Sequence, residues 1–194
     1  MAAKNCPEYK LLYESLKHCD GRPVLGGLQR RVLFQRRANV VKWAKLPADT
    51  VSMETAAVLV GDITLAMEEK WHYLELAKRK GKFSSKPDGE AGSKTVINEA
   101  EFPLPDNDEY VAGFSRISLN DELIYLVEQM DHKWRLLGSE DFDVETTCEM
   151  DSGEQGGAPS NVVKVSARDY CEAPFYTGKI ETDEGVIQGA PEAA

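Results

Sequence analysis

Apolar and polar residues alternate along much of the chain, and this period of two predicts β-strands. The alternation is present in residues 30–37, 63–68, 95–102, 142–149 and 162–168. Within 142–149, apolar or small residues occupy one face and acidic residues or threonine the other, which is typical of a strand with one face on a core. These stretches predict a mainly β protein.

A hairpin is predicted where residues 122–130 and 133–138 flank Asp131-His132. In the register that puts Met130 opposite Lys133, Glu128 lies opposite Arg135, so that opposite charges pair across the strands. The first of these strands is apolar on both faces over 123–127, and this pattern predicts a sheet that is covered on both sides.

One helix is predicted over 106–117, after Pro103 and Pro105 end a strand. Asp106 is the expected N-cap, with Glu109 as its partner in a capping box. One apolar face is formed by Tyr110, Val111, Phe114 and Ile117. The expected fold class is therefore α+β: mainly β with one flanking helix, as in a β-sandwich or barrel.

The pattern divides the chain into three parts. Residues 1–24 are expected to form an N-terminal docking arm, 25–180 a β domain, and 181–194 a flexible acidic tail. Inside the β domain, 77–94 is rich in Lys, Gly, Ser and Pro and is predicted to be an extended basic loop.

Composition places the chain among globular proteins, since 42% of its 194 residues are hydrophobic and 29% are charged. No stretch approaches the roughly 20 apolar residues that span a bilayer, and the start lacks the apolar region of a secretory signal. We therefore expect synthesis in the cytoplasm and no membrane partner. Acids outnumber bases by 33 to 23, and the net charge of −10 opposes tight binding of DNA.

Basic residues are segregated from this acidic background. Residues 21–48 contain no acid, and 77–94 collects further lysines. Such segregation predicts a charged contact surface. The candidate interface residues are Arg30, Arg31, Arg36, Arg37, Lys78, Arg79, Lys80, Lys82, Phe83 and Lys86. An equally weighted alternative is that the arginines meet acids of the same chain.

Acidic residues gather in 140–154, which contains seven acids and no base. Asp143, Glu145 and Glu149 are candidates for a functional acidic face. The alternative is an ordinary solvated strand face that Lys164 and Arg168 of the returning strand partly neutralise.

Catalytic and metal chemistry have no motif in this sequence. Cys6, Cys19, Cys148 and Cys171 are widely spaced, which indicates unlinked, packed thiols instead of a zinc site or a disulfide framework. His18, His72 and His132 have no motif around them, and phosphate-loop, nucleophile-elbow and dinucleotide-binding patterns do not occur. We expect no cofactor, no metal, no catalytic residue and no enzymatic activity.

The order of elements resembles the β-sandwich with one helix found in tail tube proteins of long-tailed phages and related injection machines. Lys133–Ser139 and Ala173–Gly178 are similar to segments of structural proteins from phages and prophages of Bacteroidetes. The resemblance covers residues 25–180. The longer N-terminal arm and the acidic tail differ from compact tube proteins and leave open a head-to-tail ring or connector protein instead.

The resemblance implies a non-enzymatic virion subunit that assembles with itself into a hexameric ring or stacked rings, and that contacts other phage structural proteins. An acidic lumen, with Asp143, Glu145 and Glu149 as the candidate lumen-facing residues, would let DNA pass without binding it tightly, because it repels the phosphates. The basic loop would then meet acidic surface on the next ring. The alternatives are a β-rich binding or adhesion module that does not assemble and, third, an enzyme.

Overall fold

The computed structural model describes residues 13–16, 25–47, 52–78, 80–155 and 159–190. In this part the protein is mainly β, with several antiparallel sheets and one α-helix, as expected from the alternation. The strands of the two larger sheets are β1 (Leu28–Arg36), β4 (His72–Glu75), β5 (Lys82–Asp88), β6 (Thr95–Leu104), β7 (Leu123–Gln129), β8 (Trp134–Leu137), β9 (Val144–Asp151), β10 (Ser160–Asp169) and β11 (Phe175–Tyr176). The remaining elements are the 3-10 helix η1 (Arg37–Asn39), the helix α1 (Glu109–Ser118) and the short strands β2 (Val40–Lys42), β3 (Thr64–Leu65), β12 (Lys179–Thr182) and β13 (Gly185–Gln188).

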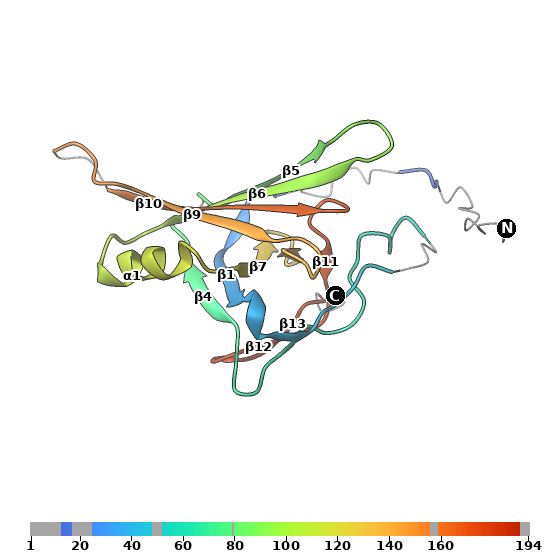
Figure 1. Cartoon of the computed structure of the whole chain (residues 1–194), viewed down its shortest axis with the longest axis horizontal. Helices are drawn as coiled ribbons and strands as arrows, with labels where there is room; N and C mark the ends of the chain where they lie inside the picture. The colour runs from blue at the N-terminus through green and yellow to red at the C-terminus, as the bar shows by residue number, and fades with distance from the viewer. Residues whose placement is uncertain (1–12, 17–24, 48–51, 79, 156–158, 191–194) are drawn as a thin grey trace.

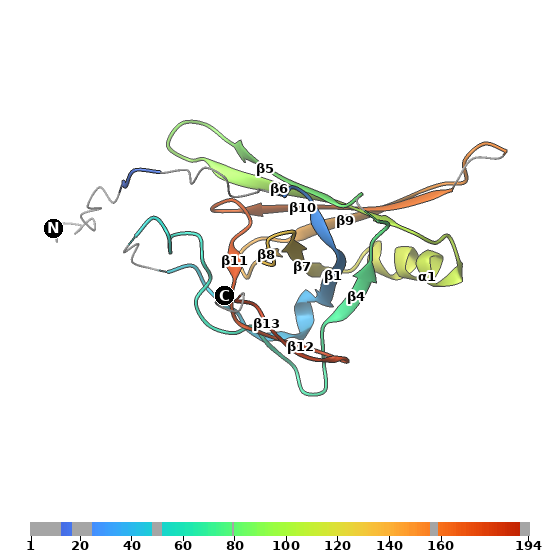
Figure 2. The same ribbon diagram turned by 180° about the vertical axis from the view of Figure 1, so that it is seen from behind.

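Two sheets lie face to face in the centre of the molecule (Figure 1). The outer sheet has four antiparallel strands in the order β5-β6-β10-β9, and its long strands follow the longest axis of the molecule. The central sheet has five strands in the order β11-β8-β7-β1-β4. The β12–β13 hairpin lies on the far side of the central sheet (Figures 1 and 2).

The central sheet is buried on both faces, as the apolar run 123–127 predicts. Tyr125 and Val127 of β7 belong to the core between the two large sheets, whereas Ile124 and Leu126 belong to a second core on the opposite side. All four are fully buried. Strand β1 shows the same division, with Val32 on one side and Leu33 on the other.

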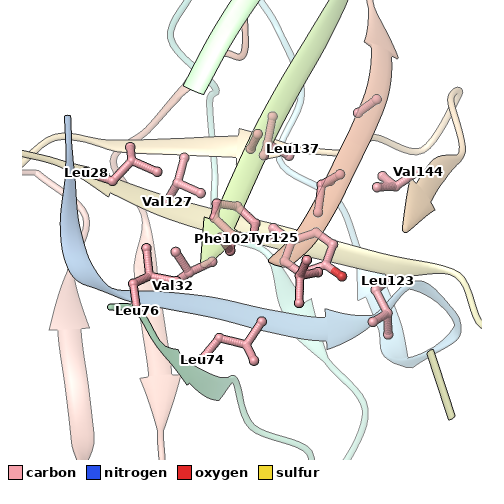
Figure 3. Packing of buried hydrophobic residues seen from close by; sticks show 14 of the residues in the cluster. Leu28, Val32, Leu74, Leu76, Phe102, Leu123, Tyr125, Val127, Leu137 and Val144 are labelled. Carbon is pink, nitrogen blue, oxygen red and sulfur yellow. The ribbon is translucent and has the colours of Figure 1, made fainter. Parts of the chain in front are cut away.

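Aliphatic side chains fill most of the core between the sheets, with Phe102 and Tyr125 among them (Figure 3). The rings of Phe102 and Tyr125 lie 5.7 Å apart, and both side chains are fully buried. The Tyr125 hydroxyl and the Thr146 hydroxyl form a hydrogen bond of 2.9 Å. This bond joins β7 to β9 and satisfies the polar atom that the buried tyrosine brings into the core.

The helix forms near the predicted place but begins later. Asp108, not Asp106, is the N-cap, because its carboxylate accepts a hydrogen bond of 3.0 Å from the backbone N–H of Val111. Val111 and Phe114 pack against the core, and Phe114 meets Phe34 of β1 edge to face at 5.2 Å. Two members of the predicted apolar face, Tyr110 and Ile117, are instead 87% and 73% exposed.

The prediction of an extended loop over 77–94 is wrong. Residues 82–88 form strand β5, which pairs with β6 from Lys82 opposite Glu101 to Asp88 opposite Thr95. The turn between the strands uses Gly89 and Gly92, both at positive φ. Phe83 is the only large apolar residue among polar ones in this strand, so the alternation gave little signal.

The β7–β8 hairpin is confirmed, but its predicted register is wrong by one residue. Val127 lies opposite Arg135, and Glu128 opposite Trp134. The connection is longer than a two-residue turn, and His132 adopts a positive φ of 61° at its end. A loop of three residues closed by one left-handed residue is a common hairpin connection, and it shifts the pairing.

The C-terminal region is more ordered than predicted up to residue 190. Residues 179–188 form the β12–β13 hairpin, and Ile180 is fully buried in the second core. Residues 191–194 of the predicted tail lie outside the described residues, as do 1–12 and 17–24 of the predicted docking arm.

Candidate assembly surface

The outer face of the four-stranded sheet carries a regular array of charged and hydroxyl side chains. The pairing of the strands places Lys82, Glu101, Lys164 and Thr147 in one row across the sheet. The next row contains Ser84, Glu99, Ser166 and Glu145. The opposite face of the same strands supplies half of the central core.

Most charges on this face are paired with each other. Three lysine ammonium groups bind glutamates of the neighbouring strand: Lys82 to Glu101 at 2.9 Å, Lys86 to Glu99 at 3.1 Å, and Lys164 to Glu149 at 2.6 Å. The hydrogen bond from Glu149 is the main cause that raises the pKa of Lys164. Arg168 binds Asp88 at 2.8 Å.

Both lateral strands of this sheet have an unpaired side. Among the described residues, β5 pairs only with β6, and β9 pairs only with β10. An unpaired strand side presents backbone N–H and C=O groups to a further strand. Pro87 in β5 and the lysines beside it are residues that sheets carry at such edges.

The arginines of the candidate interface meet acids of the same chain. Arg30 binds Glu75 at 3.0 Å, Arg31 binds Glu184 at 2.7 Å, and Arg36 binds Asp121 at 2.7 Å. Arg37 binds both Glu122 and Asp143. The structure therefore favours the alternative reading of these four residues.

The remaining interface candidates separate into two groups. Lys78 and Lys80 are exposed and form no ion pair within the described part of the chain, while Arg79 lies outside it. Phe83 is half-buried against the core, and the Arg135 guanidinium lies 5.8 Å from its ring centre. Lys82, Phe83 and Lys86 all belong to the edge strand β5.

The three lumen candidates do not all lie on the same face. Glu145 and Glu149 lie on the outer face of β9, and Glu145 forms no ion pair with a described residue. Asp143 precedes β9, and its carboxylate binds Arg37 of η1. Sequence reasoning missed Glu99 and Glu101, although they alternate with buried Asn98, Ala100 and Phe102 in β6.

Among the described residues, the cysteine and histidine side chains are packed against neighbouring groups or lie in a turn. Cys148 and Cys171 are free, and burial raises the pKa of Cys171 to about 11, which makes it a poor nucleophile at neutral pH. His72 packs on Phe34, and His132 binds Glu128 at 2.8 Å. In the described ranges no three His, Cys, Asp or Glu residues are placed to hold a metal ion.

No helix in the described part of the chain has the length and apolar character needed to cross a membrane. Comparisons of the chain with protein-family models, with curated proteins and with solved structures found no match.

Proposed function

We propose that this protein is a structural subunit of a phage virion that closes into a ring or tube through its four-stranded sheet, whose outer face lines the lumen. One observation carries the proposal: the two free edges of this sheet have opposite charge. Lys82 and Lys86 lie on the outer face of β5, and Glu145 and Glu149 lie on the outer face of β9.

The strand directions suit a closed ring of identical copies. Because each strand of β5-β6-β10-β9 is antiparallel to the next, β5 and β9 run in opposite directions. A second copy rotated about an axis along the strands would place its β5 antiparallel to β9 of the first. Such head-to-tail contacts generate a ring when the rotation closes.

One register brings opposite charges together across this junction. When Ser84 lies opposite Thr147 of the next copy, Lys82 lies opposite Glu149 and Lys86 opposite Glu145. On the core-facing side, the same register puts Phe83 opposite Cys148, which joins half-buried side chains of two cores. Lys82 would then lie between Glu101 of its own chain and Glu149 of the next copy.

The resulting wall suits the passage of DNA. Its outer-face charges alternate in sign, with Lys82, Lys86, Lys164 and Arg168 set among Asp88, Glu99, Glu101, Glu145, Glu149 and Asp151. Tight binding of a duplex needs basic groups that follow the phosphates, and this wall offers acids between them.

The size of a six-membered ring is also suitable. Six copies of a four-stranded sheet would give roughly 24 strands, and a spacing of about 4.8 Å makes the barrel about 37 Å across between backbones before strand tilt widens it. Side chains about 6 Å long on each wall leave an opening of about 25 Å, which is wide enough for a DNA duplex.

Charge reversal at one edge tests the proposal. The variant Lys82→Glu/Lys86→Glu should remain folded by circular dichroism and fail to form rings or tubes in negative-stain micrographs, because like charges would face each other at every junction. Adding Glu145→Lys/Glu149→Lys to the same chain should restore the rings.

Arg168→Glu provides a matched control, since it reverses a charge on the same face but on the inner strand β10. This control should assemble as the parent does. Rings formed equally well by the Lys82→Glu/Lys86→Glu variant, or a parent protein that stays monomeric at high concentration, would contradict the proposal.

A further inference from the structure

Two exposed apolar surfaces lie outside the four-stranded sheet. The first is one flank of α1, where Tyr110 and Ile117 are two helical turns apart and 87% and 73% exposed. The second is a groove of about 670 Å³ near β2, lined by Val41, Trp43, Leu46, Pro47 and Val60. Val41 and Val60 are themselves mostly exposed, and clustered surface apolar residues of this kind mark interaction sites.

The two surfaces lie at opposite ends of the molecule. Figures 1 and 2 show α1 at one end of the longest axis and the segments 43–47 and 52–60 toward the other end. The strands of the outer sheet run along the same axis. In a ring closed through β5 and β9, the two surfaces would therefore face adjacent rings and not neighbours in the same ring.

Their charges are complementary. Acidic residues surround the start of α1, and Asp106 and Glu109 form no ion pair with any described residue. The groove is bordered by two bases, Lys42 and Lys45, and one acid, Glu140. Lys45 binds Glu140 at 2.7 Å, whereas Lys42 is exposed and has no ion pair within the described residues.

We infer that the groove receives the α1 flank of a second copy and that this contact stacks one ring on the next. Tyr110 would enter the groove beside Trp43, and the acids at the start of α1 would approach Lys42. Aromatic anchors in a desolvated pocket with charged residues at the rim are the usual anatomy of such contacts. The surfaces differ, so the contact is head-to-tail and can repeat along an axis.

This inference rests on the proposed ring, and it replaces the expected role of a basic loop, since Lys82 and Lys86 belong to β5. The test compares a helix variant, Tyr110→Ser/Ile117→Ser, with a groove variant, Val41→Ser/Val60→Ser. Leu119→Ser is the matched control, because Leu119 is 66% exposed on another side of the α1 C-terminus.

We expect each of the two variants to form single rings in negative-stain micrographs, while Leu119→Ser stacks as the parent does. An equal mixture of helix-variant and groove-variant rings should form pairs of rings and nothing longer, because each pair has one intact helix and one intact groove at its junction. Stacks of parental length from either variant, or a mixture without paired rings, would overturn the inference.

Failure of the ring is distinguishable from failure of this contact. If the parent forms no rings, sedimentation velocity still reports end-to-end association, which should be lost in each variant and return as dimers in the mixture. Association that persists in both variants, or a parent that shows no end-to-end association, would overturn the contact. Intact rings with unchanged stacking would overturn the contact alone.

Discussion

The central sheet and the outer sheet are both antiparallel, but they differ in which faces are buried and which edges are free. The central sheet is buried on both faces, and the charges at its ends are neutralised inside the chain, as with Arg36 and Asp121. The outer sheet has one buried face, one charged face and two free edges. Of the two large sheets, the outer one therefore has the exposed charged face.

The two sheets also differ in the length of their edge strands. In the central sheet, the edge strand β4 has four residues and β11 has two, so little unpaired backbone is available. In the outer sheet, β5 has seven residues and β9 has eight. A long unpaired edge pairs readily with another strand unless something covers it. In the proposed ring, one neighbouring copy would cover β5 and the other would cover β9.

The largest effect on stability should come from the central sheet. Replacing Leu126, which is fully buried in the second core, with alanine should lower the free energy of unfolding by about 2–5 kcal/mol. The matched change Val162→Ala, on the charged face of β10, should cost far less because Val162 is only half-buried. Urea unfolding of both variants measures the difference, and similar losses would contradict the division of roles.

Adjacent threonines of β9 sharpen the comparison within one strand. Thr146→Val removes the partner of the buried Tyr125 hydroxyl and should cost about 1–3 kcal/mol, because an unsatisfied polar atom remains in the core. Thr147→Val changes the exposed face of the same strand and should leave monomer stability within about 0.5 kcal/mol. Equal effects in thermal or urea unfolding would show that the two faces are not distinct.

The sequence predicted the strands in which apolar and polar residues alternate clearly. The alternation in 142–149 and 162–168 predicted two strands with one face on the core, and these strands, β9 and β10, pair with Lys164 opposite Thr147. The same kind of signal missed β5, because Lys82–Asp88 contains Ser, Lys and Pro in place of apolar residues. A charged edge strand has the composition of a loop.

The candidate site could be predicted only as separate residues. Sequence reasoning selected Lys82, Lys86, Glu145 and Glu149 but assigned them to two distant surfaces. Which strands lie at the edges of one sheet depends on the strand order β5-β6-β10-β9, and local patterns do not report that order. The intrachain partners of the arginines were equally hidden, since Arg37 and Asp143 are far apart in sequence.

A smaller effect should appear in the pH dependence of stability. Burial is the main cause that raises the pKa of Asp169, at the end of β10, above its ordinary value of 3.8. Because the native state holds this proton more tightly than the unfolded state, Asp169 contributes stability at low pH that is lost as pH rises from 3.8 through the raised pKa.

Asp169→Asn should therefore gain stability relative to the parent as pH rises through this window, while the amide oxygen can still accept the hydrogen bond from the Tyr170 N–H. Urea unfolding at several pH values measures the difference between the two proteins. Glu145→Gln, on the exposed face, serves as the control. A constant difference between Asp169→Asn and the parent would show that burial of this carboxyl group has no effect on folding.

The central claim is that β5 of one copy pairs with β9 of the next, with Ser84 opposite Thr147. The most direct measurement is disulfide formation in the Ser84→Cys/Thr147→Cys variant under oxidation, analysed on a non-reducing gel. Within one chain the two positions are three strand spacings apart, or about 14 Å, which is too far for a disulfide. We expect a ladder of linked subunits that a reductant collapses to the monomer, and no ladder when Ser84→Cys or Thr147→Cys is made alone beside the four native cysteines. Assembled particles whose subunits stay unlinked, or that link better through Ser84→Cys/Glu145→Cys, would contradict this pairing.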